Sequence, residues 1–331
     1  MEMNKCCFVI PYFGKFNNYF PLYLKSCTCN NDFNWLIITD DKKQYDYPPN
    51  VKVLYWTFEE TVQFIMKRFN CFCNIKNPYK LCDYRPMYGY IFEEYLKEYY
   101  YWGFCDTDII LGNLSKFITV DMLKEYDKIF CLGHLTLIKN TFENNRIFMN
   151  EIAGERYYKK VLSTDYNLIF DEEGVDEYNI NSMFLKAGKK IFEEDLSLNI
   201  NIRYPYLLRT IRVSGFSGTS QQFVNEKYRT SICIWDRGNL YRLFKKSKFA
   251  LEREDYTYIH LQHRTMGISR NLVNLDKFKI LANRFLPLEF DEVNINNYGK
   301  VRKRILCNQY FKSVICSSIK KFLKISKSIL L

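Results

Sequence analysis

Residues 99–108 read YYYWGFCDTD, an uncharged and mostly aromatic run that ends in two carboxylates, Asp106 and Asp108. A run of this kind is typical of a strand buried on both faces of a sheet. Side chains two residues apart in an extended segment point the same way, with Cα atoms roughly 6.6 Å apart, which suits two oxygen ligands on one hard divalent cation. Because open α/β sheets bind ligands at the carboxyl ends of their strands, the run indicates an enzyme that handles a diphosphate.

The first half of the chain alternates strand and helix patterns. Thr57 and Glu60 have the spacing of a capping box, which marks the start of a helix. The expected strands are residues 6–11, 35–39, 51–56 and 99–105, and the expected helices are residues 19–26, 57–69 and 86–97. Such alternation implies a mostly parallel sheet with helices on both faces.

The second half is mixed and partly antiparallel. Residues 232–244 read as a hairpin that turns at DRGN, residues 236–239. Residues 251–262 read as one strand, with Tyr256, Tyr258 and His260 on one face. Further expected elements are strands at 128–132 and 135–139 and a helix within 176–187. One α/β domain with a smaller antiparallel C-terminal elaboration is the simplest account, and we place it at residues 1–298.

The positive charge of the chain is concentrated at its C-terminal end. The net charge is +11, and residues 300–331 hold nine Lys or Arg and no acid, which leaves about +2 on the rest. A nucleic-acid-binding body is therefore not expected, because its charge would spread over a face of the fold. Apolar residues recur every three or four positions between the lysines, so residues 299–331 are expected to form a basic amphipathic helix. Such a helix suits an anionic membrane surface, or it docks on the body of the protein.

The cysteine pattern bears on where the protein works. The chain has twelve cysteines, many of them within apolar runs, and no secretory signal pattern. Buried reduced thiols are typical of a cytoplasmic protein. With the basic tail, the expected location is the cytoplasm, peripheral on the inner face of the cell membrane.

His260 is the next candidate ligand after Asp106 and Asp108. A late strand that brings this imidazole back to the two carboxylates would complete a mixed oxygen and nitrogen site, which suits Mn²⁺ as well as Mg²⁺. The alternative is a partly buried structural histidine bonded to backbone.

Lys80 and Arg85 precede a predicted helix and could meet phosphate oxygens, with Asp83 holding Arg85 in place. The alternative is a solvated helix start with an ordinary surface ion pair.

Two acidic runs, DEE at residues 171–173 and DE at residues 176–177, precede another predicted helix. A carboxylate placed across from the metal could deprotonate an incoming hydroxyl, and acids at a helix start are also favoured by the helix dipole. Gly133 and His134 follow a predicted strand, where they would line a pocket or form a turn.

Several of these segments together resemble a family of bacterial glycosyltransferase-like proteins associated with surface polysaccharide synthesis. The segments that carry the resemblance are KLCDYRPMYG at 80–89, WGFCDTDIILG at 102–112, IPYFG at 10–14, WLIITDD at 35–41 and the Gly133-His134 pair. The resemblance covers most of residues 5–265. It implies a GT-A-like, Rossmann-like fold whose nucleotide-sugar half is about residues 1–125 and whose acceptor half is about residues 126–298.

The resemblance also implies roles for individual residues. Tyr12 and Phe13 would lie near the nucleotide, and Asp40 would approach the base or ribose. Asp106, Thr107 and Asp108 match the D-x-D motif of such enzymes, which contacts the ribose and a divalent metal on the diphosphate of a nucleotide sugar, here with a UDP-sugar favoured. His260 matches a late metal-binding histidine, although the glycine, lysine and tryptophan that follow it in better-known families are missing apart from Gly267.

The implied reaction moves a sugar to a glycan or lipid-linked glycan acceptor. A divalent ion and a cationic side chain would neutralise the leaving diphosphate. In an inverting reaction Asp176 or Glu177 would be the base, and Gly133 and His134 would lie on the acceptor side; a retaining reaction needs no dedicated base. The alternatives are a haloacid-dehalogenase-like phosphohydrolase that uses Asp106 and Asp108, and a non-enzymatic protein whose basic tail binds membranes or RNA.

Overall fold

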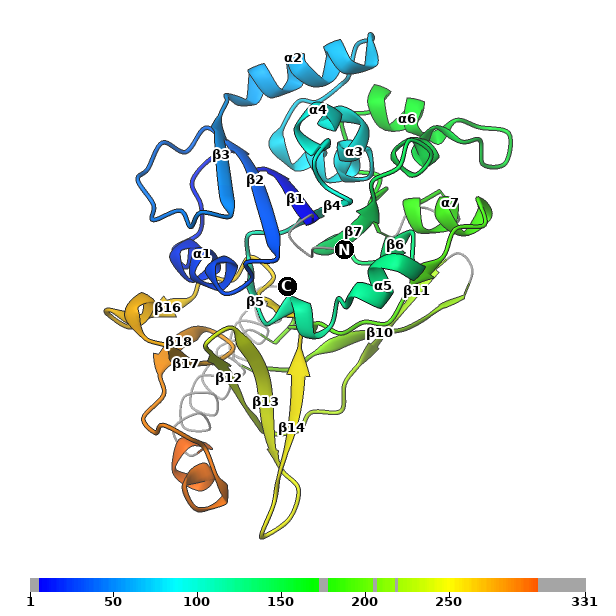
Figure 1. Ribbon diagram of the computed structural model, residues 1–331. Helices are drawn as coiled ribbons and strands as arrows, with labels where there is room; N and C mark the ends of the chain where they lie inside the picture. Colours follow the sequence, from blue (N-terminus) through cyan, green and yellow to red (C-terminus); the bar gives the residue numbers. More distant parts are fainter. Residues whose placement is uncertain (1–5, 173–177, 205–206, 218–219, 303–331) are drawn as a thin grey trace, which may run out of the picture.

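The computed structural model describes residues 6–172, 178–204, 207–217 and 220–302. Its centre is a seven-stranded sheet of order β3-β2-β1-β4-β7-β6-β8 (Figure 1). All neighbouring strands are parallel except that β7 runs antiparallel to both β4 and β6. The strands are β1 (Cys6–Pro11), β2 (Phe33–Thr39), β3 (Val51–Tyr55), β4 (Tyr101–Cys105), β6 (Lys128–Ile129), β7 (Leu135–Lys139) and β8 (Ile191–Phe192). The expected mixed α/β class with a mostly parallel sheet is confirmed.

The middle strands β1 and β4 carry only uncharged, mostly apolar residues because both faces of the sheet are covered. Every residue of β4 is buried, as the aromatic run predicts, although the strand begins at Tyr101 and not at Tyr99, and Tyr100 is exposed. Gly103 of β4 has a separate reason: a Cβ there would lie 2.1 Å from the backbone oxygen of Thr136 on β7. The close approach of β4 and β7 therefore requires glycine at this position. The expected strand 128–132 stops early because Phe130 has a positive φ of 66°.

Helices cover both faces of this sheet. One face packs against α1 and α5, and the other packs against α2, α3, α4, α6, α7 and the 3₁₀ segments η1 and η3, as the two hydrophobic clusters that share the sheet show. The capping box of α2 is present, since Thr57 and Glu60 bond each other's backbone N–H groups. The bounds are α1 (Phe20–Thr28), α2 (Phe58–Phe69), η1 (Pro78–Met87), α3 (Tyr88–Ile91), α4 (Glu93–Leu96), η2 (Leu114–Lys116), α5 (Val120–Glu125), η3 (Asn144–Met149), α6 (Tyr157–Ser163) and α7 (Ile180–Lys186).

The single helix expected over residues 86–97 is wrong. The chain forms the 3₁₀ segment η1 and two four-residue helices, α3 and α4. Pro86 lies inside η1 and has no N–H to donate to a continuous helix, and the backbone of Phe92 leaves the helical region at φ −101°, ψ 24°. Short turns here let the segment follow the end of the sheet and carry Arg85 to its rim.

The second half is mixed and partly antiparallel, as expected: most of its strand pairs are antiparallel, while β9 is parallel to β15 and β16 is parallel to β18. A six-stranded sheet has the order β14-β13-β12-β17-β18-β16, and a three-stranded sheet has the order β5-β15-β9. The predicted hairpin is confirmed: Asp236 pairs with Asn239, and Arg237 and Gly238 supply the positive φ angles of the turn. The remaining bounds are β5 (Ile109–Leu111), β9 (Leu198–Asn199), β10 (Ile211–Ser217), β11 (Ser220–Asn225), β12 (Ser231–Asp236), β13 (Asn239–Lys245), β14 (Leu251–Tyr256), β15 (Tyr258–His260), β16 (Gly267–Ile268), η4 (Leu272–Asn274), β17 (Lys277–Ile280) and β18 (Arg284–Pro287).

The strand expected over residues 251–262 is divided at Thr257, which donates its backbone N–H and its hydroxyl to Leu196. Tyr256 ends β14 in the six-stranded sheet, while Tyr258 and His260 belong to β15 in the small sheet. The three side chains therefore do not line one continuous strand face.

Two other expectations concern the ends of the described segments. Residues 295–302 are helical, and the rest of the expected basic tail, 303–331, lies outside the described residues, as do Asp176 and Glu177. Within the described segments, every helix falls short of the length and apolar character that crossing a membrane requires.

Candidate metal centre

Three potential ligands converge where β4 ends. Asp106 and Asp108 lie in the link between β4 and β5, and β15 pairs with β5 so that His260 stands opposite Ile109. The backbone N–H of Leu261 donates to the backbone oxygen of Asp108 at 2.9 Å. The antiparallel pairing of two short strands, far apart in sequence, therefore delivers the imidazole to the carboxylates.

The ligand atoms are close enough to share one ion. One oxygen from each aspartate and one ring nitrogen of His260 all lie within 4.8 Å of one another. Nε2 of His260 is 3.5 Å from Oδ1 of Asp108 and 3.7 Å from Oδ2 of Asp106. The mixed oxygen and nitrogen set predicted from the sequence is thus brought together, and it suits Mn²⁺ or Mg²⁺.

The surroundings of these side chains also fit a cation. Oδ2 of Asp108 accepts the backbone N–H of His263 at 2.6 Å, whereas its buried Oδ1 has no hydrogen-bond partner among the described residues. Nδ1 of His260 lies 3.2 Å from Oδ1 of Asn199, an oxygen that also accepts from Gln262 at 2.7 Å. Nδ1 therefore donates to Asn199, which leaves Nε2, the nitrogen that faces the carboxylates, as the atom that would bind a metal.

The carboxylates and His260 each favour the charged form of the other. Burial acts to raise the pKa of Asp108, but His260, His263 and the backbone N–H of His263 hold it below its usual range. Burial acts to lower the pKa of His260, and Asp108 and then Asp106 raise it above its usual value. Asp108 is consequently a carboxylate at neutral pH, the form that binds a metal.

Arg85 links this cluster to a second group of acids. Its guanidinium forms an ion pair with Asp106 and another with Asp171, at 2.9 Å, and it donates to the backbone oxygen of Gly133 at 2.9 Å. The expectation that Asp83 holds Arg85 is wrong, because Asp83 faces the other way and binds Lys80.

Lys80 requires a correction too. Its ammonium group is fully buried and donates to Asp83, Thr164 and the backbone oxygen of Tyr166. All three donors are used, so Lys80 holds loops together and does not reach the cavity as a phosphate ligand. Asp83 also accepts from the backbone of residues 168 and 170, which completes a buried polar network.

Asp171 and Glu172 belong to the acidic run noted in the sequence, although the sequence favoured Asp176 and Glu177 as the base, and both line the cavity. Oε2 of Glu172 accepts the backbone N–H of Gly133 at 2.7 Å. Burial raises the pKa of Asp171 to about 7; the positive charge of Arg85 acts to lower it, and the negative charge of Glu172 acts to raise it further. Burial also raises the pKa of Glu172. The signal was the acidic cluster at 171–177, in which Asp171 and Glu172 line the cavity while Asp176 and Glu177 lie outside the described residues.

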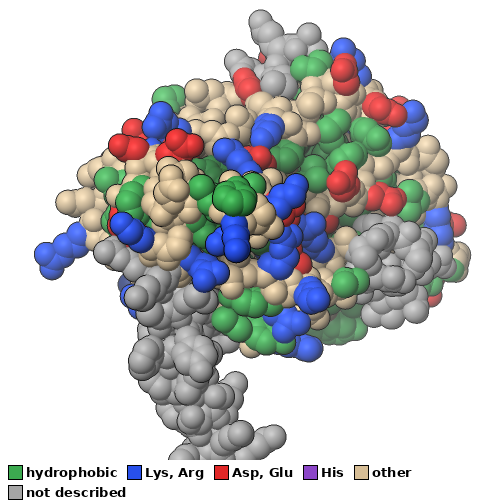
Figure 2. Space-filling view, turned by 90° about the horizontal axis from the view of Figure 1, so that it is seen from below, with side chains coloured by type: hydrophobic (Ala, Val, Ile, Leu, Met, Phe, Trp, Pro, Cys, Tyr) green, Lys and Arg blue, Asp and Glu red, His purple; other side chains and the backbone are tan. Residues whose placement is uncertain are grey.

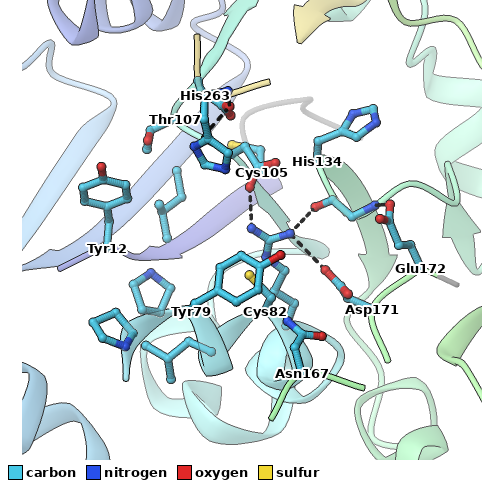
Figure 3. Close-up of a pocket in the computed structure, with 18 of the residues that line it drawn as sticks. Tyr12, Tyr79, Cys82, Cys105, Thr107, His134, Asn167, Asp171, Glu172 and His263 are labelled. Atoms are coloured by element: carbon cyan, nitrogen blue, oxygen red, sulfur yellow. Dashed lines mark hydrogen bonds and ion pairs between the residues drawn. The ribbon is translucent and has the colours of Figure 1, made fainter. Parts of the chain in front are cut away.

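A cavity of about 430 Å³ lies beside the three ligands (Figure 3). Tyr12 lies on one side of it, with Asp171 and Glu172 on the other. The predicted site residues that line it are Tyr12, Phe13, Arg85, Asp106, Thr107, Asp108, Gly133, His134 and His260. Asp40 does not line it; its carboxylate accepts the backbone N–H of Gly14 at 2.7 Å and so fixes the loop after β1. Tyr79, Asn167 and Ile169 were not predicted and stand at the cavity wall.

His134 presents a buried imidazole to the same cavity. Its ring lies on that of His260, with centroids 4.3 Å apart, and its Nδ1 is 2.6 Å from the hydroxyl of Tyr258. Burial and then the nearby His260 hold the pKa of His134 well below its usual value, so the ring is neutral. Its Nε2 is buried and has no hydrogen-bond partner among the described residues.

Comparisons with known proteins identify a family without a described activity. Neither a search of curated proteins nor a search of solved structures found a match. One family model matches residues 8–289, a span that includes every residue of the candidate metal centre and the acids around it. The chain therefore belongs to DUF6625, a family of unknown function.

Proposed function

We propose that the protein is a metal-dependent glycosyltransferase of the GT-A type, with a nucleotide sugar as donor, a UDP-sugar favoured, and a glycan or lipid-linked glycan of the cell surface as acceptor. The observation that carries the proposal is the Asp106–Asp108–His260 cluster, which opens into a cavity at the carboxyl end of a buried parallel strand. The mostly parallel sheet, with helices on both faces, agrees with the fold that the sequence resemblance implies. The protein would act at the inner face of the cell membrane.

Asp108 and His260 would hold the cation, with Asp106 as the third ligand. When bound, a divalent ion supplies positive charge that stabilises the departing diphosphate. Asn199 keeps His260 in the tautomer that can bind metal, and the backbone of His263 fixes the rotamer of Asp108. The protein groups thus preorganise the site before donor binding.

On the donor side, the loop after β1 would hold the nucleotide. Tyr12 packs on Phe16 with ring centroids 4.5 Å apart, and Phe13 packs edge-on against Phe58 at 5.5 Å. Both rings line the cavity with positions fixed by packing, which suits contact with a planar base. Asp40 would support this loop through Gly14 and would not touch the base itself.

The acceptor would enter from the side of Asp171 and Glu172. Burial raises the pKa of both acids. A carboxylate whose pKa lies closer to 7 is a better general base for a hydroxyl proton at neutral pH. The carboxylate of Glu172 accepts the backbone N–H of Gly133, whereas the carboxylate of Asp171 is held in an ion pair with Arg85. In an inverting reaction Glu172 is therefore the favoured base among the described residues, beside the earlier candidates Asp176 and Glu177.

A thermal-shift panel tests the proposal. UDP-, GDP-, CMP- and dTDP-sugars are added with and without Mn²⁺ to the wild type, to Asp108→Asn and to the control Asp121→Asn, which changes an exposed acid on α5. We expect at least one nucleotide sugar to raise the Tm of the wild type and of the control only when Mn²⁺ is present, and none to do so in Asp108→Asn. Metal-dependent release of phosphate from simple esters, with no response to any nucleotide sugar, would contradict the proposal and favour a phosphohydrolase.

A further inference from the structure

The tip of the β13–β14 hairpin, residues 245–250, is an unusual surface element. It reads KKSKFA, and all six residues are exposed. Phe249 is 88% exposed, more than any other large hydrophobic residue among those described. In Figure 1 the hairpin projects from the end of the molecule away from the seven-stranded sheet. An aromatic side chain held this far out has no packing role in the fold.

The lysines at this tip have no acidic partners in the part of the chain that the structure describes. Lys245, Lys246 and Lys248 form no ion pair with any described residue, although the chain has many such pairs. The nearest acids on the same hairpin, Glu252 and Glu254, are bound by Arg229. Seen from below, Lys and Arg side chains gather around a hydrophobic group near the middle of this face (Figure 2). The tip therefore presents uncompensated positive charge beside an apolar side chain.

The backbone holds the tip in shape. Lys246 and Ser247 both donate N–H groups to the oxygen of Ala250, at 3.1 and 3.2 Å, and the N–H of Phe249 donates to Oγ of Ser247 at 3.1 Å. Below the tip, β13 and β14 pair continuously from Leu240 with Tyr256 to Lys245 with Leu251. Because the tip is already ordered, little additional conformational entropy is lost when a partner binds at Phe249.

We propose that this tip docks on the surface of an anionic lipid bilayer, with Phe249 inserted at the level of the headgroups and the three lysines facing lipid phosphates. Aromatic rings favour that interfacial depth, and lysines are attracted by the negative surface potential. A convex tip with one aromatic ring gives a long nucleic-acid strand no groove to follow, and the chain outside residues 300–331 carries only about +2 in net charge. The inference is independent of the reaction that the cavity catalyses, and it concerns residues separate from the C-terminal tail.

The test is co-sedimentation of the full chain with vesicles of phosphatidylcholine alone or mixed with phosphatidylglycerol. Changing Lys245, Lys246 and Lys248 together to Gln is expected to weaken binding to the anionic vesicles by about fivefold per lysine, since each contributes about that factor near the surface. The matched control changes Lys42, Lys67 and Lys159 to Gln, which removes the same charge from exposed positions elsewhere. Phe249→Ser is compared with Phe72→Ser, whose ring is 74% exposed on another loop.

We expect the two hairpin variants to lose binding and both controls to bind like the wild type, with Tm unchanged in all four. Equal losses in the hairpin and control triples would mean that binding follows net charge alone, and would overturn the proposal. So would wild-type binding by both hairpin variants, which would assign any membrane contact to other residues. A hairpin variant that loses binding to a single-stranded oligonucleotide, while no protein binds vesicles, would assign the tip to nucleic acid instead.

Discussion

Gly133→Ala is a sharp test of the link between Arg85 and the candidate metal centre. A Cβ at Gly133 would lie 2.6 Å from Oδ2 of Asp171, and 3.2 Å from both Nη1 of Arg85 and Oε2 of Glu172. The first distance is shorter than real contacts allow, so Asp171 must move. Because Arg85 holds Asp171 and Asp106 at once, that movement reaches a candidate metal ligand.

The size of the effect follows from the packing. Inserting one methyl group into a filled site costs about 1–3 kcal/mol. For 331 residues, with an unfolding entropy of about 2.1 cal/mol/K per residue, this lowers Tm by roughly 1.5–4 °C. Displacing the partner of a metal ligand reduces metal affinity by about 10–100-fold. We therefore expect a modest loss of stability together with a larger loss of Mn²⁺ binding.

The assay is differential scanning calorimetry combined with Mn²⁺ titration by calorimetry. Gly299→Ala is the control, because a Cβ there meets nothing within 4 Å and the position is helical. The control should match the wild type in metal affinity and be equally or slightly more stable. If Gly133→Ala binds Mn²⁺ as tightly as the control does, the proposed chain of contacts from Gly133 through Arg85 to the metal centre is refuted.

Three further outcomes are expected. Asn199→Leu should weaken Mn²⁺ binding by about 10–100-fold with little change in Tm, because it removes the group that orients His260; titration calorimetry would show an unchanged affinity if that role is wrong. Lys80→Met should lower the free energy of unfolding by about 3–5 kcal/mol, measured in urea, since Asp83 is left buried without its ion-pair partner; a loss below 1 kcal/mol would contradict this. The pKa of Asp171 is raised from 3.8 to about 7 in the folded state, so its contribution to the free energy of unfolding is full below pH 4 and is lost as pH rises to about 7. The free energy of unfolding of Asp171→Asn, measured across pH 4–8, should lack that decline. Parallel curves of unfolding free energy against pH for the variant and the wild type would contradict this prediction.

Much of the fold is predictable from the sequence, because its central strands β1 and β4 are largely buried and its helix starts and turns carry clear signals. Residues 101–105 of the aromatic run form a buried strand, and the capping box at Thr57 and the turn at Arg237 and Gly238 form as predicted. The failures lie where local pattern and tertiary context disagree. The apolar spacing of residues 86–97 is helical, but Pro86 and the geometry of the sheet end break the segment into short turns.

The part of the candidate site that could be predicted is the part where the residue types alone limit the possible chemistry. Two acids and a histidine suit a metal wherever they meet, and the pairing of β5 with β15 brings them together. Lys80 has the same charge as a phosphate ligand, and only burial against Asp83 reveals its structural role. The acidic run at 171–177 likewise indicated a group of acids near the site. Which of these acids face the cavity depends on the path of the loop, and the spacing of residues in the sequence does not determine that path.

The balance of charge around the cavity has a consequence for the order of binding. Four carboxylates line it, those of Asp106, Asp108, Asp171 and Glu172, and Arg85 is the one Lys or Arg side chain among the lining residues. Both ion pairs of Arg85 are already made with two of these acids, so its charge is largely neutralised. A diphosphate that entered alone would meet a net negative site, and its desolvation would not be compensated. A divalent cation between Asp106, Asp108 and His260 would offset most of that negative charge, so under the proposed function we expect a nucleotide-sugar donor to bind together with the metal or after it.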